Sequence, residues 1–376
     1  MASTMPQATE YDDPIDWLRL IRSRRVGAVT FHRLLGEHGS ARAALAALPQ
    51  IARAAGVDGY EVCPPGVAEA EMRSGRAFGA RLLLWGGPDY PAALMDLPDA
   101  PPILWARGEV GLLQRPMVAM VGARNASSLG LRMARRLAEG LGQGGQVVVS
   151  GLARGIDTAA HEASLDSGTV AVMAGGIDVT YPEENVELAR QIAARGCLLS
   201  EQPMGCVPQT RHFPLRNRII SGLSRAVVVV EAAARSGSLI TARDALDQGR
   251  EVMAVPGHPF DARAAGCNQL LRDGATLVRH AGDVAEALGL AMPHPARETP
   301  AEPPPLPGPE APRRPLGDIA QVHGQILARL GPSPLAEDQL IRDLALPPSV
   351  LTPALMSLEL EGRITRAPGG LLSRAE

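Results

Sequence analysis

Hydrophobic positions follow three different patterns along this chain, and each pattern predicts a different kind of structure. From Pro14 to about Gly66 apolar residues recur at helical spacing and are interrupted by Gly27, Gly36 and Gly39. This pattern predicts a small bundle of short helices over residues 14–78, with helix–glycine–helix turns and a preceding tail at residues 1–13.

Over residues 79–292 short apolar runs alternate with amphipathic segments. The expected strands are Arg81–Trp85, Met117–Val121, Val147–Ser150, Val170–Ala174, Leu198–Ser200, Val227–Glu231, Val252–Val255 and a weak Thr276–Val278. The expected helices are Leu129–Leu141, Thr158–Asp166, Glu184–Ala194, Ser238–Gln248 and Gly266–Arg272. Continuous valine-rich runs are typical of parallel strands buried on both faces. The sequence therefore predicts an α/β domain with a Rossmann-like, doubly wound parallel sheet.

The last part of the chain begins with a proline-rich stretch at residues 293–315, which we interpret as a semi-rigid linker. Within residues 316–376, three helical segments are expected at Gly317–Leu330, Ala336–Leu344 and Ser349–Glu361. Two short strands, Arg363–Arg366 and Leu371–Arg374, would follow as a hairpin. Three helices and a terminal hairpin predict a winged-helix domain.

Composition narrows the class of protein. The chain has 376 residues, of which 45% are hydrophobic and 20% charged, and its net charge is −3. These values are typical of a globular protein of two or three domains. No apolar run approaches the roughly 18 residues of a membrane span, and the N-terminus lacks the pattern of a secretory signal. We expect a cytoplasmic protein with no membrane contact.

Cysteine and lysine usage exclude several kinds of site. The four cysteines form no C-x-x-C pair and have no matching histidine cluster, so we predict no metal site. All 37 basic residues are arginine, which excludes a P-loop lysine and Schiff-base chemistry. We predict no cofactor and no catalytic residue.

Glycine, serine and arginine gather where the predicted strands end. The strand Met117–Val121 is followed by Gly122-Ala123-Arg124, Val147–Ser150 by Gly151-Leu-Ala-Arg154-Gly155, and Val227–Glu231 by Arg235-Ser-Gly-Ser238. Ligands of an open α/β sheet bind beyond the carboxyl ends of its strands, where glycines and exposed helix amides favour anions. For each turn alone, chain geometry or helix capping is the better explanation. Arg124 and Arg154 carry more weight because they lie inside turns and not on helix faces.

One segment is unusually basic. Residues 202–230 contain no Asp or Glu but include Arg211, His212, Phe213, Arg216, Asn217, Arg218 and Arg225. Arginine matches phosphate oxygens, and a neighbouring aromatic ring offers a surface on which a base can stack. The alternative is a loop whose arginines pair with carboxylates such as Glu201 and Glu231. We favour contact with nucleic acid.

An ordered set of motifs resembles one known family. The motifs are Gly122-Ala-Arg124, Ser150-Gly-Leu-Ala-Arg-Gly-Ile-Asp157, Tyr181-Pro-Glu-Glu-Asn185, Phe213-Pro-Leu-Arg-Asn-Arg-Ile-Ile-Ser-Gly-Leu-Ser224, Ser236-Gly-Ser-Leu-Ile-Thr-Ala242, Gly249–Gly257 and Gly266–Ala275. Together they resemble the DNA-processing protein A family, also called DprA or Smf, from about Gly79 to Leu290. The helical region is similar to that family's SAM-like or helix-hairpin-helix-like domain, and the C-terminal region to its winged helix.

The resemblance implies an extended Rossmann-like core that binds single-stranded DNA, loads the RecA recombinase during natural transformation and forms a homodimer. Carried over by position, it implies a DNA site at Gly122, Arg124, Ser150, Gly151, Arg154, Gly155, Arg211, Phe213, Arg216, Asn217, Arg218, Ser236 and Gly237. Many relatives have a lysine three residues before the motif phenylalanine. This chain has Thr210 there, followed by Arg211, which we expect to substitute for it.

Two further hypotheses follow from charge and motif. Residues 316–376 hold five arginines against seven acidic residues, and Ser349–Glu361 has no basic residue. The winged helix is therefore expected to contact a protein or to pack against the rest of the chain, and not to read the major groove.

The rival function is a nucleotide-binding hydrolase similar to phosphoribohydrolases, with Glu231 and Ser236-Gly-Ser238 at the strand end. The P-G-G-x-G-T-x-x-E signature of those enzymes is absent.

Overall fold

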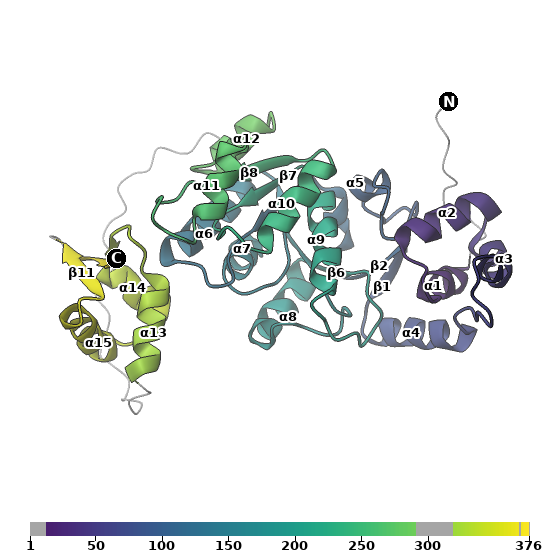
Figure 1. Cartoon of the computed structure of the whole chain (residues 1–376), viewed down its shortest axis with the longest axis horizontal. Coiled ribbons are helices and arrows are strands. Elements are labelled where there is room, and N and C mark those ends of the chain that lie inside the picture. The colour runs from purple at the N-terminus through teal and green to yellow at the C-terminus, as the bar shows by residue number, and fades with distance from the viewer. Residues whose placement is uncertain (1–12, 291–318, 368–369, 376) are drawn as a thin grey trace.

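The computed structural model describes residues 13–290, 319–367 and 370–375, and shows a helical domain, a sheet domain and a winged helix side by side along the long axis (Figure 1). The predicted linker at 293–315 and the tail before residue 13 lie outside the described residues. No helix in the described ranges is both long and apolar enough to cross a bilayer.

Four helices form the N-terminal domain: α1 (Pro14–Arg22), α2 (Ala28–His38), α3 (Ala41–Ala54) and α4 (Pro65–Ala77). The Asp13 and Ser40 side chains cap α1 and α3 by accepting backbone N–H groups. Gly39 ends α2 with a φ of 77°, a left-handed conformation that favours glycine. The Trp17 and Phe31 rings pack 5.0 Å apart in the domain core.

A nine-stranded sheet forms the centre of the molecule. Its strands are β1 (Arg81–Leu84), β2 (Ile103–Gly108), β3 (Met117–Val121), β4 (Val147–Ser150), β5 (Thr169–Val172), β6 (Cys197–Ser200), β7 (Ala226–Val229), β8 (Glu251–Ala254) and β9 (Thr276–Leu277). They are ordered β1-β2-β6-β5-β4-β3-β7-β8-β9, and β3 to β9 are parallel to one another. This confirms the predicted doubly wound sheet. The antiparallel strand β2, which extends the sheet from β6 to β1, was not predicted.

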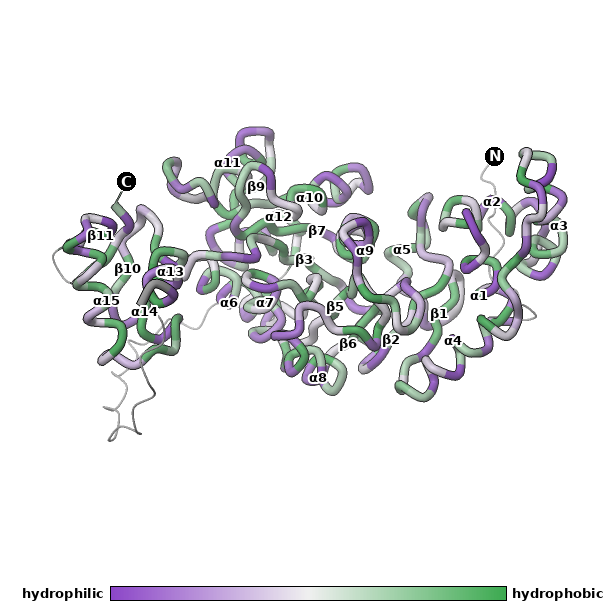
Figure 2. The backbone as a smooth tube through the Cα atoms, turned by 60° about the horizontal axis from the view of Figure 1, so that its bottom comes forward, coloured by the Kyte–Doolittle hydropathy of each residue, from purple (hydrophilic) through white to green (hydrophobic). Residues whose placement is uncertain are grey.

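Helices cover both faces of the sheet. They are α5 (Ala92–Met95), α6 (Ser128–Gln143), α7 (Ile156–Ser164), α8 (Val186–Arg195), α9 (His212–Leu223), α10 (Ser238–Asp247), α11 (Ala265–Arg272) and α12 (Ala281–Ala287), with 3-10 turns η1 (Val110–Gln114) and η2 (Glu183–Asn185). Alternate residues of β3 enter two separate cores: Val118 and Met120 belong to the core with α6, α7 and α12, and Met117 and Val121 to the core that includes α9 and α10. Figure 2 shows the apolar strands enclosed between these layers.

The C-terminal domain contains α13 (Ile319–Arg329), β10 (Leu335–Ala336), α14 (Glu337–Leu344), α15 (Pro348–Leu360), β11 (Ile364–Ala367) and β12 (Leu371–Arg374). Its three strands pair in the order β10-β12-β11, and Leu340, Leu355 and other residues form a core of its own. The predicted winged helix is therefore confirmed.

Hydrogen bonds join both outer domains to the sheet domain. In the N-terminal domain, the Glu71 carboxylate accepts hydrogen bonds from Arg22 and from Trp105 Nε1 of β2. On the other side, Arg263, in the loop after β8, donates to the carbonyls of Ala328 and Leu330 at the end of α13. Carbonyls at a helix C-terminus lack partners within the helix, so an arginine satisfies them well.

Candidate nucleic-acid interface

Two glycine turns pack against each other at the carboxyl edge of the sheet. A Cβ on Gly155 would lie 2.3 Å from Ala123 O, and one on Gly122 would lie 2.6 Å from Ile156 Cγ1. Only glycine permits this approach, and Gly155 also has a φ of 77°. The turns after β3 and β4 thereby present Arg124 and Arg154, both exposed, from adjacent positions.

An aromatic pair lies beside Arg124. The Arg124 guanidinium carbon is 5.1 Å from the centroid of the Phe213 ring, within the range of a cation–π contact. Phe213 is at the start of α9, and its ring centroid is 5.8 Å from that of Tyr181, which lies in the loop after β5. Tyr181 is 52% exposed. Three separate segments thus bring a cation and two rings to one surface.

Two more arginines lie on neighbouring segments. Arg154 Nε donates to Glu184 Oε2 at 2.6 Å, but about 60% of each side chain is exposed, and such surface pairs are weak. Arg211, directly before α9, is exposed and donates through Nε to the His212 ring at 3.3 Å. We define the arginine–aromatic surface as Arg124, Arg154, Tyr181, Arg211 and Phe213.

Arg216 lies beneath this surface and not on it. Its side chain is buried, and Nη1 donates to the carbonyls of Gly151 at 2.5 Å and Val172 at 2.9 Å. Burial lowers the pKa of Arg216 to about 10, and the nearby Asp157 carboxylate opposes that shift. Asp157 in turn accepts the backbone N–H groups of Gly151 and Ala153. Arg216 and Asp157 therefore hold the turn that carries Arg154.

Arg218 does not join the surface. Its Nη2 donates to Glu201 Oε2 at 2.6 Å, and its Nε lies 3.4 Å from Asp99 Oδ2. For Arg218 the structure thus shows the carboxylate pairing that the sequence left open. Glu231, the other carboxylate considered, accepts instead from Ser127 N and Oγ.

The remaining predicted residues have structural contacts or lie further along the edge. Ser150 is buried and its hydroxyl donates to Met120 O, and Asn217 is buried on α9. Ser236 and Gly237 precede α10 at the end of β7, which lies on the opposite side of β3 from β4. The Ser236 hydroxyl lies 2.7 Å from that of Ser238.

Tyr181 was missing from the predicted site. Its motif was recognised in the sequence, but nothing in the local pattern indicated that its ring meets Phe213. The position of Tyr181 in the sequence does predict where it lies. Because Tyr181 follows the third parallel strand, it has to lie at the same edge of the sheet as Arg124.

The described residues contain no group of three or more His, Cys, Asp or Glu side chains arranged to hold a metal ion. Cys63, Cys197, Cys206 and Cys267 are all free thiols.

Family comparisons cover all three domains. Residues 81–289 match the family model of the DNA recombination-mediator protein A. Residues 11–74 match a DprA-like N-terminal HHH domain, and residues 298–370 match a DprA winged helix domain.

Individual relatives agree with these matches. The chain is 46% identical over 197 residues to the DNA processing protein DprA of Streptococcus pneumoniae, covering 52% of this chain and 70% of the relative. It is 37% identical over 284 residues to the protein Smf of Escherichia coli, covering 75% and 74%.

Two solved structures have similar folds. DNA processing protein A from Streptococcus pneumoniae superimposes with a TM-score of 0.55 at 34% identity, over 70% of this chain and 98% of that chain. DNA processing protein A from Helicobacter pylori, reported for its single-stranded DNA binding mode, gives a TM-score of 0.52 at 30% identity, over 56% and 95%.

Proposed function

Because the chain belongs to the DNA recombination-mediator protein A family, we propose that it binds single-stranded DNA at the arginine–aromatic surface. We further propose that it loads a RecA-type recombinase onto that DNA during natural transformation, in the cytoplasm. The family and the reported DNA binding of the Helicobacter pylori relative support this proposal.

The observation that carries the proposal is the contact of Arg124 with Phe213 next to the exposed Tyr181 ring. An unpaired strand offers bases that stack on aromatic rings and phosphates that pair with arginine. A duplex hides its bases, so this surface favours single strands. Since the whole chain has a net charge of −3, attraction to DNA has to come from such a local group of cations.

Fluorescence anisotropy with a labelled oligothymidine and a duplex of equal length tests this function. We expect tighter binding of the single strand. Arg124→Ala should weaken it about tenfold to a hundredfold, the range of a lost charge-assisted contact. Arg272→Ala is the matched control, because Arg272 is an exposed arginine on α11 whose ion pair with Asp273 is loose at 3.8 Å. Equal affinity for both forms of DNA, or an Arg124→Ala variant that binds as well as the control, would contradict the proposal.

For the winged helix we propose contact with a protein. Helix α15 has no basic residue and exposes Met356 and Leu360, the latter 85% exposed. Arg366 of the adjacent strand is held by Glu337 and Glu359. An apolar face whose neighbouring arginine is already paired suits a protein partner better than the DNA backbone.

Recombinase loading can be measured as RecA filament formation on single-stranded DNA already coated with a single-strand-binding protein. We expect the full chain to shorten the lag before filament growth, and Arg124→Ala to lose this effect. A lag that the wild-type chain leaves unchanged would refute loading and leave DNA binding standing.

We also propose a homodimer. Leu246 on α10 and Leu277 on β9 are exposed apolar side chains, and β9 is an edge strand of the sheet. Exposed apolar side chains and unpaired strand edges favour association. Light scattering of the purified chain gives its mass directly, and a monomer at all concentrations would exclude the dimer.

We propose that this function involves binding and no hydrolysis. The rival hydrolase would use the Glu231 carboxylate. That carboxylate accepts hydrogen bonds from Ser127 N and Oγ. Incubation with nucleoside monophosphates followed by chromatography tests this point, and release of free base would support the rival.

A further inference from the structure

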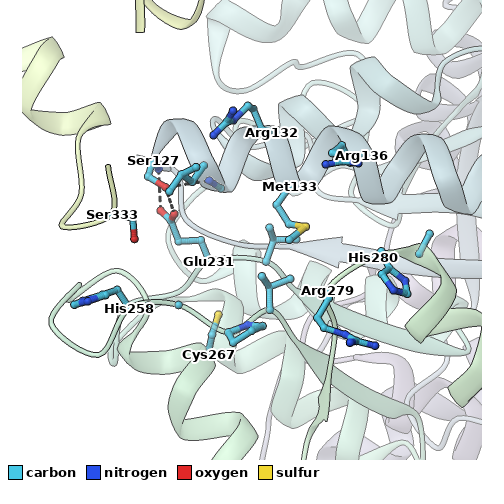
Figure 3. A pocket seen from close by; sticks show the side chains of 18 of the residues that line it. Ser127, Arg132, Met133, Arg136, Glu231, His258, Cys267, Arg279, His280 and Ser333 are labelled. Carbon is cyan, nitrogen blue, oxygen red and sulfur yellow. Dashed lines mark hydrogen bonds between the residues drawn. The ribbon is translucent and has the colours of Figure 1, made fainter. Parts of the chain in front are cut away.

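A large cavity lies on the other side of β3 from the arginine–aromatic surface. It is a cavity of about 1150 Å³ between α6, the loop after β8 and the start of α12 (Figure 3). Ser333 of the winged-helix domain lines it as well, next to the segment that Arg263 holds through the carbonyls of Ala328 and Leu330.

The cavity lies where the order of strands in the sheet reverses. Strand β3 has β4 on one side and β7 on the other, so the order of strands reverses between β3 and β7. Ligands of doubly wound sheets bind at such a switch point, beyond the carboxyl ends of the strands. The cavity is lined by Ser127 after β3, Glu231 after β7 and His258 after β8. The arginine–aromatic surface belongs to the turns after β3 to β6 and leaves this position free.

The cavity is cationic along α6. Arg132 and Arg136 are one helical turn apart and both line the cavity. Neither has a carboxylate partner among the residues that the structure describes. The other lining arginine, Arg279, is already bound to Asp283. Two guanidinium groups on the same helix, without a carboxylate partner in the described part of the chain, match the charge and geometry of phosphate oxygens.

The opposite end of the cavity has the opposite character. The buried Glu231 carboxylate accepts from Ser127 N at 2.9 Å and from its hydroxyl at 2.5 Å, at the start of α6. A Cβ on Gly130 would lie 2.5 Å from Glu231 Oε2, so glycine is needed for this approach. The carboxylate repels phosphate from the helix N-terminus but can accept further hydrogen bonds. Met133, the neighbour of Arg132 on α6, adds an apolar side chain to the lining.

We infer that this cavity binds a nucleoside phosphate, with its phosphates on Arg132 and Arg136 and its base or sugar donors toward Glu231. Such a ligand combines hydrogen-bond donors, an apolar ring face and negative charge, which match the Glu231 carboxylate, the Met133 side chain and the two arginines that line the cavity. The source of the nucleotide is either a free nucleoside triphosphate or the 5′-phosphorylated end of a DNA strand. The inference does not rest on the arginine–aromatic surface.

Isothermal titration calorimetry of the full chain with ATP tests the site. We expect Arg132→Ala and Arg136→Ala each to weaken ATP binding about tenfold or more, as for other lost charge-assisted contacts. Arg135→Ala is the matched control, because Arg135 lies between them on α6 and does not line the cavity. Circular dichroism establishes that each variant is folded.

A second arm distinguishes the two sources. An oligothymidine with a 5′-phosphate is compared with the same strand lacking it. If ATP does not bind but the 5′-phosphate tightens oligonucleotide binding, and Arg132→Ala abolishes that gain, the site takes the strand end.

The inference is overturned if neither ATP binding nor the 5′-phosphate gain depends on Arg132 and Arg136. It is equally overturned if Arg135→Ala has the same effect as the two lining variants. Arg124→Ala separates this result from the proposed function, because it should weaken binding of unphosphorylated DNA and leave ATP binding unchanged.

Discussion

Gly151→Ala is the most severe test of how Arg216 holds the turn beneath the arginine–aromatic surface. A Cβ at this position would lie 1.8 Å from Arg216 Nη1, 2.4 Å from Cζ and 2.7 Å from Nη2. Arg216 cannot move aside easily, because it is buried and donates to Gly151 O and Val172 O. The added methyl group must therefore displace either the turn or the guanidinium.

The expected loss of unfolding free energy has two parts. Overpacking a tight site costs about 1–3 kcal/mol. Weakening one hydrogen bond of a buried charged group costs about 1.5–3 kcal/mol more. We therefore expect Gly151→Ala to lose about 2.5–6 kcal/mol, and also to weaken DNA binding because Arg154 is carried by the same turn.

Urea unfolding followed by circular dichroism measures this loss. Gly237→Ala is the control: a Cβ added there would have no described atom within 4 Å, the φ of Gly237 is −61°, and we expect a change below about 1 kcal/mol. In an Arg216→Met background the cost of Gly151→Ala should shrink, because the guanidinium is gone. If the unfolding free energy of Gly151→Ala lies within about 1 kcal/mol of the wild-type value, Arg216 does not hold the turn as we propose.

Two further predictions concern other parts of the fold. Burial lowers the pKa of His161 to about 3, and its Nε2 accepts the Leu152 N–H, so the folded state keeps the ring neutral while the unfolded chain binds a proton below about pH 6.5. Stability should therefore fall by about 1.6 kcal/mol from pH 6.5 to pH 5 in urea titrations, and an equal slope in His161→Gln would contradict this cause. Arg263→Ala should release the end of α13, because Arg263 donates to the carbonyls there. Trypsin should then cleave after Arg329 faster than in the control Arg342→Ala, as followed by mass spectrometry. Equal cleavage rates would show that Arg263 does not hold the domain.

Much of the sheet domain could be predicted because its strands are buried on both faces. Met117–Val121 and Val147–Ser150 have the predicted bounds, since continuous apolar runs there end at glycine turns. Strand β2 was missed because Ile103–Gly108 follows two prolines and pairs antiparallel with β6, outside the βαβ repeat. The predicted domain boundaries themselves stay predictions.

The candidate site was predictable where a residue's position in a turn determines its exposure, as for Arg124 and Arg154. Part of the basic segment, His212–Leu223, forms α9, so its charges do not all face one way. His212, Arg216, Ile219 and Leu223 recur at helical spacing and are all buried. That spacing was a signal that Arg216 belongs to the inner face of a helix. The partners of Arg218 come from distant segments, and no local pattern could identify them.

The salt dependence of DNA binding tests the central claim most directly. Each phosphate neutralised on a single strand contributes about −0.7 to the slope of log Kobs against log salt. For oligothymidine, the account predicts a steep slope for the wild-type chain and a slope about 0.7 shallower for Arg124→Ala, with Arg272→Ala unchanged. A flat response in the wild-type chain, or an identical slope in Arg124→Ala, would contradict the claim that this surface holds the DNA backbone.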